Sequence, residues 1–290
     1  MESYFTPPCY NYFHKYVSKY GLNIRIFIFL AQKPREHGSQ ITIFTAFMKK
    51  MIKPVQNNPE TKKKQVTKMF DGISKRYDIL NRIITIGIDV LWRKRVVQLI
   101  KKHKHDNILD IATGTGDLVI ELARLETQKI IGLDISPGML ALGKQKVAEK
   151  KLHKRIDMQL GDSEALHFDD ACFDAVTIAF GVRNFENLDK GLHEILRVLK
   201  PKGTLVILET AVPKNVFLKG FYTLYTQNIM PLVGKILSKD RSAYQYLSES
   251  AAAFPCGEAF NNILRKNGFI QVEDFPQTLG VSSIYFAKKP

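Results

Sequence analysis

Two glycines that follow a short apolar run mark the first residues that can do chemistry. The run Ile108-Leu-Asp-Ile-Ala112 contains one acidic residue, Asp110, and leads into Gly114-Thr-Gly116. This pattern is typical of a buried parallel strand that turns sharply into a helix and leaves backbone N–H groups bare for a nucleotide-like ligand. We therefore predict that Asp110, Gly114 and Gly116 belong to a cofactor-binding site.

The residues after the second glycine indicate which ligand binds. A dinucleotide-binding turn carries a third glycine, and its pyrophosphate needs a bare, positively polarised helix start. Here Asp117-Leu-Val119 follows instead, so an acidic side chain lies at that helix start. An uncharged or cationic ligand suits this turn better, which favours the sulfonium cofactor S-adenosyl-L-methionine over NAD.

The ends of the apolar runs supply polar groups for the parts of such a ligand. In a doubly wound sheet these ends meet at one edge, where ligands bind. The backbone N–H groups and the hydroxyl at Thr115 can hold the methionine carboxylate, and Asp134, 18 positions beyond the second glycine, can accept both ribose hydroxyls. The carboxylate of Asp162 can accept the adenine amino group. The next run ends in Arg183-Asn184, where a substrate would meet the methyl group.

Each of these residues also has a purely structural interpretation. A lone Gly-x-Gly is more often a turn than a site, Asp134 can cap the helix that begins near Pro137, and Asp162 can be a surface carboxylate. Arg183-Asn184 can merely cap the loop that follows. The glycine turn together with three correctly spaced acidic residues at strand ends favours a site.

Strand-like and helix-like runs alternate from about Thr67 onward and must position these residues. Such alternation predicts a parallel sheet covered by helices on both faces. One helix is expected from Thr67 and a second through Trp92 to Ile100, and Pro201-Lys-Gly203 is expected to stop a later helix. The expected strands are 108–112, 129–133, 157–160, 175–180, 204–208, 270–275 and 281–287, and the expected helices among them are 117–125, 137–150 and 188–199.

Composition limits the class of protein and its partners. The 290 residues carry a net charge of +15, which indicates an anionic partner, either nucleic acid or an anionic membrane surface. The three cysteines, Cys9, Cys172 and Cys256, have no metal-ligand spacing and form no disulfide framework, so we expect a reducing compartment and no metal. The longest apolar run, 24–31, contains Arg25 and is too short to span a bilayer.

The first 56 residues differ from the rest in composition. They are aromatic and basic, and among them only Glu2 and Glu36 are acidic. We expect a poorly ordered extension at 1–56 and a single domain at 57–290. Two alternatives stay open, namely a signal or transit peptide and a true start at Met48 or Met51.

Five segments of the chain resemble the ubiquinone/menaquinone biosynthesis C-methyltransferases. The resemblance runs in order from about Thr67 to the C-terminus. The glycine turn and the Arg-Val-Leu-Lys-Pro run are common to many methyltransferases of this class, whereas the Tyr-Asp pair, the Phe-Gly-x-Arg-Asn run and the Tyr-x-Tyr-Leu-x-Glu-Ser run are far more particular. The five segments are Phe70–Asp78, Leu109–Asp117, Phe180–Asn184, Arg197–Gly203 and Tyr244–Ser250.

The resemblance implies a fold and a set of cofactor contacts. The implied fold is α/β, with a doubly wound, mostly parallel seven-stranded Rossmann-like methyltransferase sheet, an antiparallel C-terminal strand and a helical N-terminal lid. Cofactor contacts in the family fall on positions that here are Thr115, Asp134, Asp162 and Ser163. One position departs from the pattern, because some members have a cofactor-contacting serine where this chain has Ala179.

The implied reaction is methyl transfer from S-adenosyl-L-methionine to a ring carbon of a prenylated quinol, either demethylmenaquinol or a ubiquinol precursor. The ring carbon becomes nucleophilic when a neighbouring hydroxyl, with a pKa of about 10, loses its proton. We expect Arg183 to stabilise the phenolate and Asn184 to orient the ring. Tyr77 and Asp78 are the candidates for placing a water that removes the proton.

Two further features concern the apolar substrate. The segment 216–233 is rich in aromatic residues and can line an apolar pocket or serve only as core packing. The basic tail and Lys62-Lys-Lys64 can hold the protein on an anionic membrane. The expected location is therefore cytoplasmic and peripheral on the inner face of the cytoplasmic membrane. Assembly into a homo-oligomer stays open.

A nucleic-acid methyltransferase and a non-catalytic cofactor-binding scaffold are the alternative classes. Enzymes that methylate base amino groups usually end the fourth strand with Asn or an acidic residue and two prolines, and this chain has Ala179-Phe-Gly-Val182 there. Ring-carbon methylation of pyrimidines uses a cysteine nucleophile, and no cysteine lies at an expected strand end. The intact glycine turn argues against a scaffold, so quinol methylation without a nucleic-acid partner is the prediction.

Overall fold

An apolar run forms the middle strand of the first half of the sheet. The computed structural model describes residues 52–213 and 241–290, and β1 (Asn107–Ile111) lies between β2 (Lys129–Asp134) and β4 (Phe173–Ala179), parallel to both. The last four residues of β1 are buried, as expected for a strand that is covered on both faces. The strand predicted at 108–112 is therefore present, shifted by one residue.

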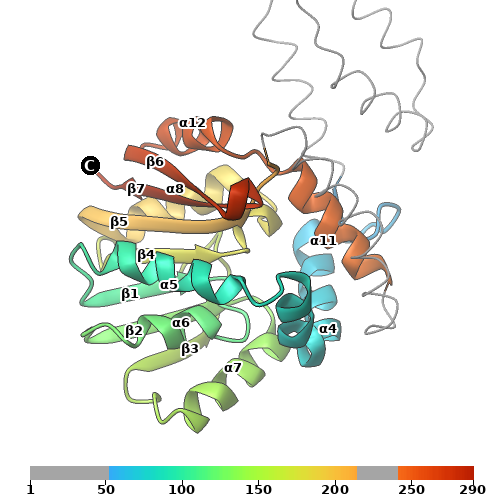
Figure 1. Ribbon diagram of the computed structural model, residues 1–290, viewed down its shortest axis with the longest axis horizontal. Coiled ribbons are helices and arrows are strands. Elements are labelled where there is room, and N and C mark those ends of the chain that lie inside the picture. Colours follow the sequence, from blue (N-terminus) through green and yellow to red (C-terminus); the bar gives the residue numbers. More distant parts are fainter. Residues whose placement is uncertain (1–51, 214–240) are drawn as a thin grey trace, which may run out of the picture. The chain divides into compact units, whose positions relative to one another are not determined.

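Seven strands form one mixed sheet in the order β3-β2-β1-β4-β5-β7-β6 (Figure 1). The pairings among β1 to β5 are parallel, whereas β7 is antiparallel to both of its neighbours. This arrangement confirms the predicted doubly wound α/β class with its antiparallel C-terminal strand. The other strands are β3 (Ile156–Leu160), β5 (Leu199–Thr210), β6 (Ile270–Gln277) and β7 (Ser282–Lys288).

The chain changes direction across the sheet next to β1. It runs outward from β1 through β2 to β3 and then returns to β4, on the other side of β1. The carboxyl ends of β1 and β4 therefore form the topological switch point, which is where open α/β sheets bind ligands. The predicted site residues follow β1, β2, β3 and β4 along the chain, so the topology brings them to this edge.

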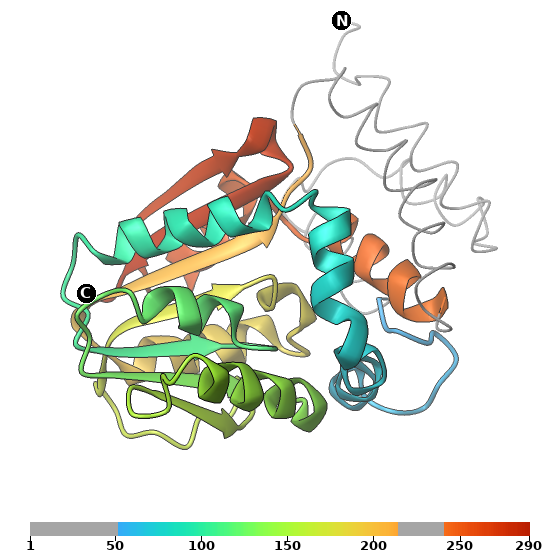
Figure 2. The ribbon, with the colours of Figure 1, turned by 60° about the horizontal axis from the view of Figure 1, so that its bottom comes forward.

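Helices cover both faces of the sheet (Figures 1 and 2). Trp92 of α5 and Leu118 of α6 are buried in one apolar cluster, which also contains Leu140 of α7. Leu192 of α8 and Phe260 of α12 are buried in a second cluster, against the other face. These helices are α5 (Asp89–Ile100), α6 (Asp117–Leu122), α7 (Pro137–Glu149), α8 (Leu188–Val198) and α12 (Glu258–Lys266).

Two further helices, α4 (Lys62–Ile84) and α11 (Arg241–Ala253), lie beyond the carboxyl ends of the strands (Figure 2). Ile73 of α4 is buried in a third apolar cluster with Met139 of α7 and Tyr246 of α11. The helical N-terminal part of the predicted fold is thus present. It is fixed against the switch point by apolar packing with α7 and α11.

The helix α4 begins at Lys62, earlier than the expected start near Thr67. The hydroxyl of Thr61 accepts the backbone N–H of Lys64 and so caps the helix. The cap lies in a basic, polar stretch. The apolar residues at helical spacing, on which the predicted start near Thr67 depended, begin only after this stretch. The three lysines therefore form the first turn of α4.

The strand β5 begins at Leu199, five residues before the expected start at Thr204. The helix α8 already ends at Val198, so the predicted stop at Pro201-Lys-Gly203 lies within β5. The pairing of β4 with β5 shifts register there. The segment 216–233, predicted to line a pocket or to pack in the core, lies outside the described residues, as does the chain up to residue 51. Within residues 52–213 and 241–290, no helix has the length and hydropathy that crossing a membrane requires.

Candidate active site

The glycine turn after β1 adopts a backbone conformation that favours glycine. Gly114 has φ +56° and Gly116 has φ +81°, both in the left-handed region. A Cβ atom on Gly116 would also lie 3.3 Å from Cγ2 of Val119. The helix α6 begins directly afterwards at Asp117, so the predicted strand–turn–helix arrangement is present.

The carboxylate of Asp134 binds this turn from the end of β2. Its Oδ2 accepts the backbone N–H of Gly114 at 2.7 Å, and its Oδ1 accepts the N–H of Ser136 at 2.8 Å. Burial raises the pKa of Asp134 against the opposing effect of these N–H donors. The helix cap of α7 is the hydroxyl of Ser136, which accepts the N–H of Met139. Asp134 therefore bridges the two turns, and capping α7 is left to Ser136.

Asp110 lies within β1, four residues before Gly114 of the glycine turn. Its side chain is buried, and its Oδ1 accepts the hydroxyl of Thr177 at 2.6 Å. Burial raises the pKa of Asp110 to about 7, and the neighbouring charge of Asp134 acts in the same direction. The carboxyl group of Asp110 therefore links β1 to β4 through Thr177.

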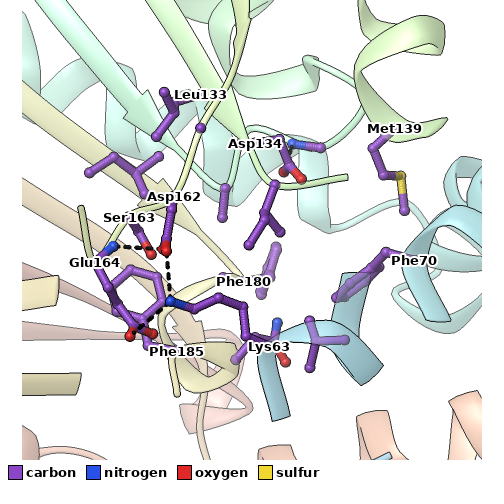
Figure 3. A pocket seen from close by; sticks show the side chains of 18 of the residues that line it. Lys63, Phe70, Leu133, Asp134, Met139, Asp162, Ser163, Glu164, Phe180 and Phe185 are labelled. Carbon is purple, nitrogen blue, oxygen red and sulfur yellow. Dashed lines mark hydrogen bonds and ion pairs between the residues drawn. The ribbon is translucent and has the colours of Figure 1, made fainter. Parts of the chain in front are cut away.

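A cavity lies at the switch point, between the strand ends and α4 (Figure 3). The predicted site residues that line it are Tyr77, Gly114, Asp134, Asp162, Ser163 and Asn184. Aromatic and apolar side chains complete much of the wall, among them Phe70, Met139, Phe180 and Phe185. Ala179, the position that departs from the family pattern, also lies in the lining. The predicted residues outside this lining are Asp78, Asp110, Thr115, Gly116 and Arg183.

Asp162 forms an ion pair with a residue that the sequence did not single out for the site. The ammonium of Lys63 lies 2.6 Å from Oδ2 of Asp162 and 3.2 Å from Oε2 of Glu164 (Figure 3). Burial acts to lower the pKa of Lys63, but its two carboxylate partners outweigh this effect and raise it. The neighbouring Lys62 donates to the backbone carbonyl of Arg183 at 2.9 Å. Both lysines were predicted for membrane contact, and both reach the candidate site.

Asp78 reaches the glycine turn. Its Oδ1 accepts the hydroxyl of Thr115 at 2.6 Å, and its Oδ2 lies 2.7 Å from the ammonium of Lys146. Lys146 also donates to Thr115 at 3.1 Å and pairs with Asp117 at 2.6 Å. These contacts join α4 and α7 to the start of α6, so the hydroxyl of Thr115 serves in this network.

Arg183 is buried behind the cavity wall in an ion pair with Glu209, at the end of β5. The guanidinium also donates to the backbone carbonyl of Phe180 at 2.9 Å. Burial alone would lower the pKa of Arg183, and the charge of Glu209 reverses this so that the pKa is raised. Among the described residues, none accepts a hydrogen bond from its Nε. The one sequence signal for Glu209 is an acidic residue that ends an apolar run.

Tyr77 and Asn184 bring polar groups to the lining of the cavity. Tyr77 contacts Phe70 edge-on, with ring centroids 5.8 Å apart. Burial raises the pKa of Tyr77, so its hydroxyl keeps its proton at neutral pH and can donate. Asn184 accepts the hydroxyl of Tyr246 from α11 at 3.1 Å. The hydroxyl of Tyr77 therefore has a proton to donate in the cavity.

The chemistry of the cavity fits a cationic nucleoside better than a phosphate. Asp134 and Asp162 offer acceptors, the glycine turn offers open backbone at Gly114, and much of the remaining lining is apolar and aromatic. Lys63, the basic residue in the lining, is paired with carboxylates. No group of three or more potential ligand side chains that could hold a metal ion occurs in the part of the chain that the structure describes.

The fold and this cavity define a Rossmann-like methyltransferase. A S-adenosylmethionine-dependent methyltransferase from Thermotoga maritima has the same fold, with a TM-score of 0.55 over 77% of this chain and 99% of that chain at 16% identity. A second one, from Aquifex aeolicus, gives a TM-score of 0.53 over 73% and 98% at 16% identity. At such low identity these structures confirm the fold alone.

The chain belongs to the ubiE/COQ5 methyltransferase family, whose model matches residues 58–289. The demethylmenaquinone methyltransferase of Bacteroides fragilis is 44% identical over 82% of this chain and 97% of its own length. The ubiquinone/menaquinone biosynthesis C-methyltransferase UbiE of Geobacter sulfurreducens is 41% identical over 79% of this chain and 90% of its own length. The predicted class, an enzyme that depends on S-adenosylmethionine, is thereby confirmed.

Proposed function

We propose that this protein methylates a ring carbon of demethylmenaquinol, with S-adenosyl-L-methionine as the methyl donor. The observation that carries the proposal is a cavity whose lining combines two kinds of side chain. Acidic side chains follow β2 and β3, and Tyr77, Phe70 and Asn184 supply aromatic and amide groups. The family membership, and the name of the Bacteroides fragilis relative, support the choice of a quinol.

The acidic side chains of the lining suit the nucleoside part of the cofactor. Asp134 would accept the ribose hydroxyls with the lone pairs that its two N–H donors leave free. Asp162 would accept the adenine amino group, and Ser163 would contact the ring beside it. Gly114 leaves open backbone for the methionine part. When bound, the cofactor supplies an electrophilic methyl group on a sulfonium.

The aromatic side chains of the lining suit the quinol ring. The ring carbon attacks after a neighbouring hydroxyl has lost its proton, and a phenolic pKa of about 10 means that the site must favour the anion. The amide of Asn184 and the hydroxyl of Tyr77 can donate to the phenolate oxygen. The ring carbon would take the methyl group as the bond from methyl to sulfur breaks, which leaves S-adenosylhomocysteine, and the ring carbon would then release its proton to water as the aromatic ring is restored. Alignment of the two carbons contributes about 7–11 kcal/mol.

The predicted role of Arg183 stays part of the proposal. The charge of its guanidinium opposes the rise in the pKa of Tyr77. This positive charge would make the hydroxyl of Tyr77 a stronger donor. If Arg183→Ala kept full turnover with unchanged cofactor affinity, this electrostatic role would be wrong.

The proposed location is cytoplasmic, on an anionic membrane surface where a prenylated quinol dissolves. The net charge of +15 supports it, at about 1 kcal/mol per basic residue near the surface. Sedimentation with vesicles of anionic lipid, and with vesicles of neutral lipid as control, tests it. Binding without preference for anionic lipid would contradict it.

The test of the proposed reaction is an incubation of the full chain with methyl-labelled S-adenosylmethionine and one acceptor at a time. The acceptors are demethylmenaquinol, a demethylated ubiquinol precursor and RNA. We expect label in the naphthoquinol. Label in the ubiquinol precursor alone would show that the substrate is a benzoquinol and not demethylmenaquinol. Label in RNA alone would overturn the proposal in favour of a nucleic-acid methyltransferase.

A further inference from the structure

Tyr246 of α11 is a buried tyrosine whose hydroxyl faces the cavity wall from behind. Its side chain is only 2% exposed and packs in the apolar cluster that joins α4, α7 and α11. It belongs to the segment Tyr244–Ser250, one of the segments that carry the family resemblance. Its hydroxyl donates to Oδ1 of Asn184 at 3.1 Å.

This hydrogen bond determines which side of the Asn184 amide is engaged. An amide has one accepting oxygen and one donating NH₂ group. Because the hydroxyl of Tyr246 occupies the oxygen, the donating group stays available on the residue that lines the cavity. Tyr246 itself is not among the described lining residues, and its hydrogen bond to Asn184 connects it to the cavity.

The surroundings of Tyr246 keep its hydroxyl a donor. Burial raises its pKa, with the charge of Arg183 acting against this rise and that of Glu209 acting with it. The phenol therefore stays protonated across the physiological range. A protonated hydroxyl with one proton can donate to one acceptor, and the structure gives that proton to Asn184.

We propose that Tyr246 is a positioning residue, which fixes the amide of Asn184 so that its N–H donors point to the quinol oxygen that becomes negative. This inference rests on the proposed function. An amide turned the other way would present its oxygen to a phenolate and repel it. The fixed orientation would be worth most in the transition state, when the charge develops.

The principal test is Tyr246→Phe in the full chain, which removes the hydroxyl and keeps the ring. The substrates are methyl-labelled S-adenosylmethionine and a short-chain demethylmenaquinol kept reduced. We expect kcat to fall about five- to tenfold, less than the roughly 10²–10³ that loss of an oxyanion donor costs. We expect KM for the quinol to change less than twofold, and the affinity for S-adenosylhomocysteine to stay within twofold. An unchanged kcat would overturn the inference.

The matched control is Tyr285→Phe. Tyr285 is also buried, at 1% exposure, and its hydroxyl accepts the backbone N–H of Gly257 at 2.9 Å on the α12 side of the sheet. Loss of that hydroxyl removes a comparable buried hydrogen bond without contact to Asn184. We expect it to affect thermal stability but not kcat. An equal loss of kcat in both variants would show a general structural effect and overturn the inference.

A double-mutant cycle separates action through Asn184 from independent action. In the Asn184→Ala background, Tyr246→Phe should cause no further loss of kcat, because the amide that it positions is absent. Additive losses would overturn the inference.

Asn184→Asp is the alternative variant if Tyr246→Phe does not fold, since a carboxylate accepts from Tyr246 but cannot donate to a phenolate. Wild-type kcat in Asn184→Asp would overturn the inference too. A wild-type protein that methylates no quinol would instead refute the proposed function.

Discussion

Arg183 and Glu209 form an ion pair inside the protein, between the turn after β4 and the end of β5. Their side chains are 7% and 0% exposed. The same carboxylate accepts the backbone N–H of Thr210 at 2.7 Å and its hydroxyl at 3.0 Å. Each of these buried charges is stabilised by the other, because removal of either one would leave the remaining charge buried with an uncompensated desolvation penalty.

Removal of one partner should therefore destabilise the fold strongly. We expect Glu209→Ala to lower the free energy of unfolding by about 3–5 kcal/mol, since it leaves the guanidinium of Arg183 buried and unpaired. Urea denaturation measures the change. Arg265→Ala is the control, because its ion pair with Glu258 is exposed and worth about 0–1 kcal/mol. Equal effects of the two variants would contradict the prediction.

Asp134 should be needed for cofactor affinity. Asp134→Asn keeps the size of the side chain but removes the charge, and it leaves one of the two N–H donors, those of Gly114 and Ser136, facing an amide NH₂. A hydrogen bond to a charged group is worth about 1.5–3 kcal/mol, so we expect affinity for S-adenosylhomocysteine to fall about 10- to 100-fold. Isothermal titration calorimetry measures it. Asp157→Asn, on an exposed residue of β3, is the control and should bind normally.

Asp78 should affect cofactor affinity more than turnover. Its carboxylate bonds to Thr115 and Lys146, so its contacts lead to the glycine turn and not to the cavity lining. We expect Asp78→Asn to weaken binding of S-adenosylhomocysteine about fivefold, the equivalent of about 1 kcal/mol. Unchanged affinity with a large loss of kcat would instead favour the predicted role of Asp78 in proton removal.

The strand ends could be predicted from the sequence because each is a local signal. An apolar run followed by an acidic residue places Asp134 and Asp162, and parallel pairing then brings their ends to one edge. The Gly-x-Gly turn is equally local, since it depends on two positive φ angles within three residues. Gly114, Asp134, Asp162 and Ser163 all line the cavity, together with residues that the sequence did not single out, such as Glu164.

The partners of these residues could not be predicted, because they come from distant parts of the chain. Lys63 and Asp162 form a hydrogen bond although they are 99 positions apart in the sequence, and Tyr246 and Asn184 do so although they are 62 positions apart. A lysine in a basic cluster carries no sign that its ammonium lies between two carboxylates. The orientation of Arg183 is likewise set by Glu209, which the sequence shows only as the polar end of a strand.

Asp110 should make stability depend on pH in a defined direction. Its pKa is about 7 in the folded protein, because of burial, and about 4 in an unfolded chain. Between these values the folded protein holds a proton that the unfolded chain has released, so the free energy of unfolding falls as pH rises from 4 to 7 and levels off above. The total contribution is on the order of 4 kcal/mol.

The variant Asp110→Asn tests this prediction, because its side chain cannot titrate and still offers an oxygen to Thr177. Urea denaturation of both proteins from pH 5 to pH 8 should show the wild type losing stability relative to the variant up to about pH 7, and a constant difference across this range would contradict the prediction.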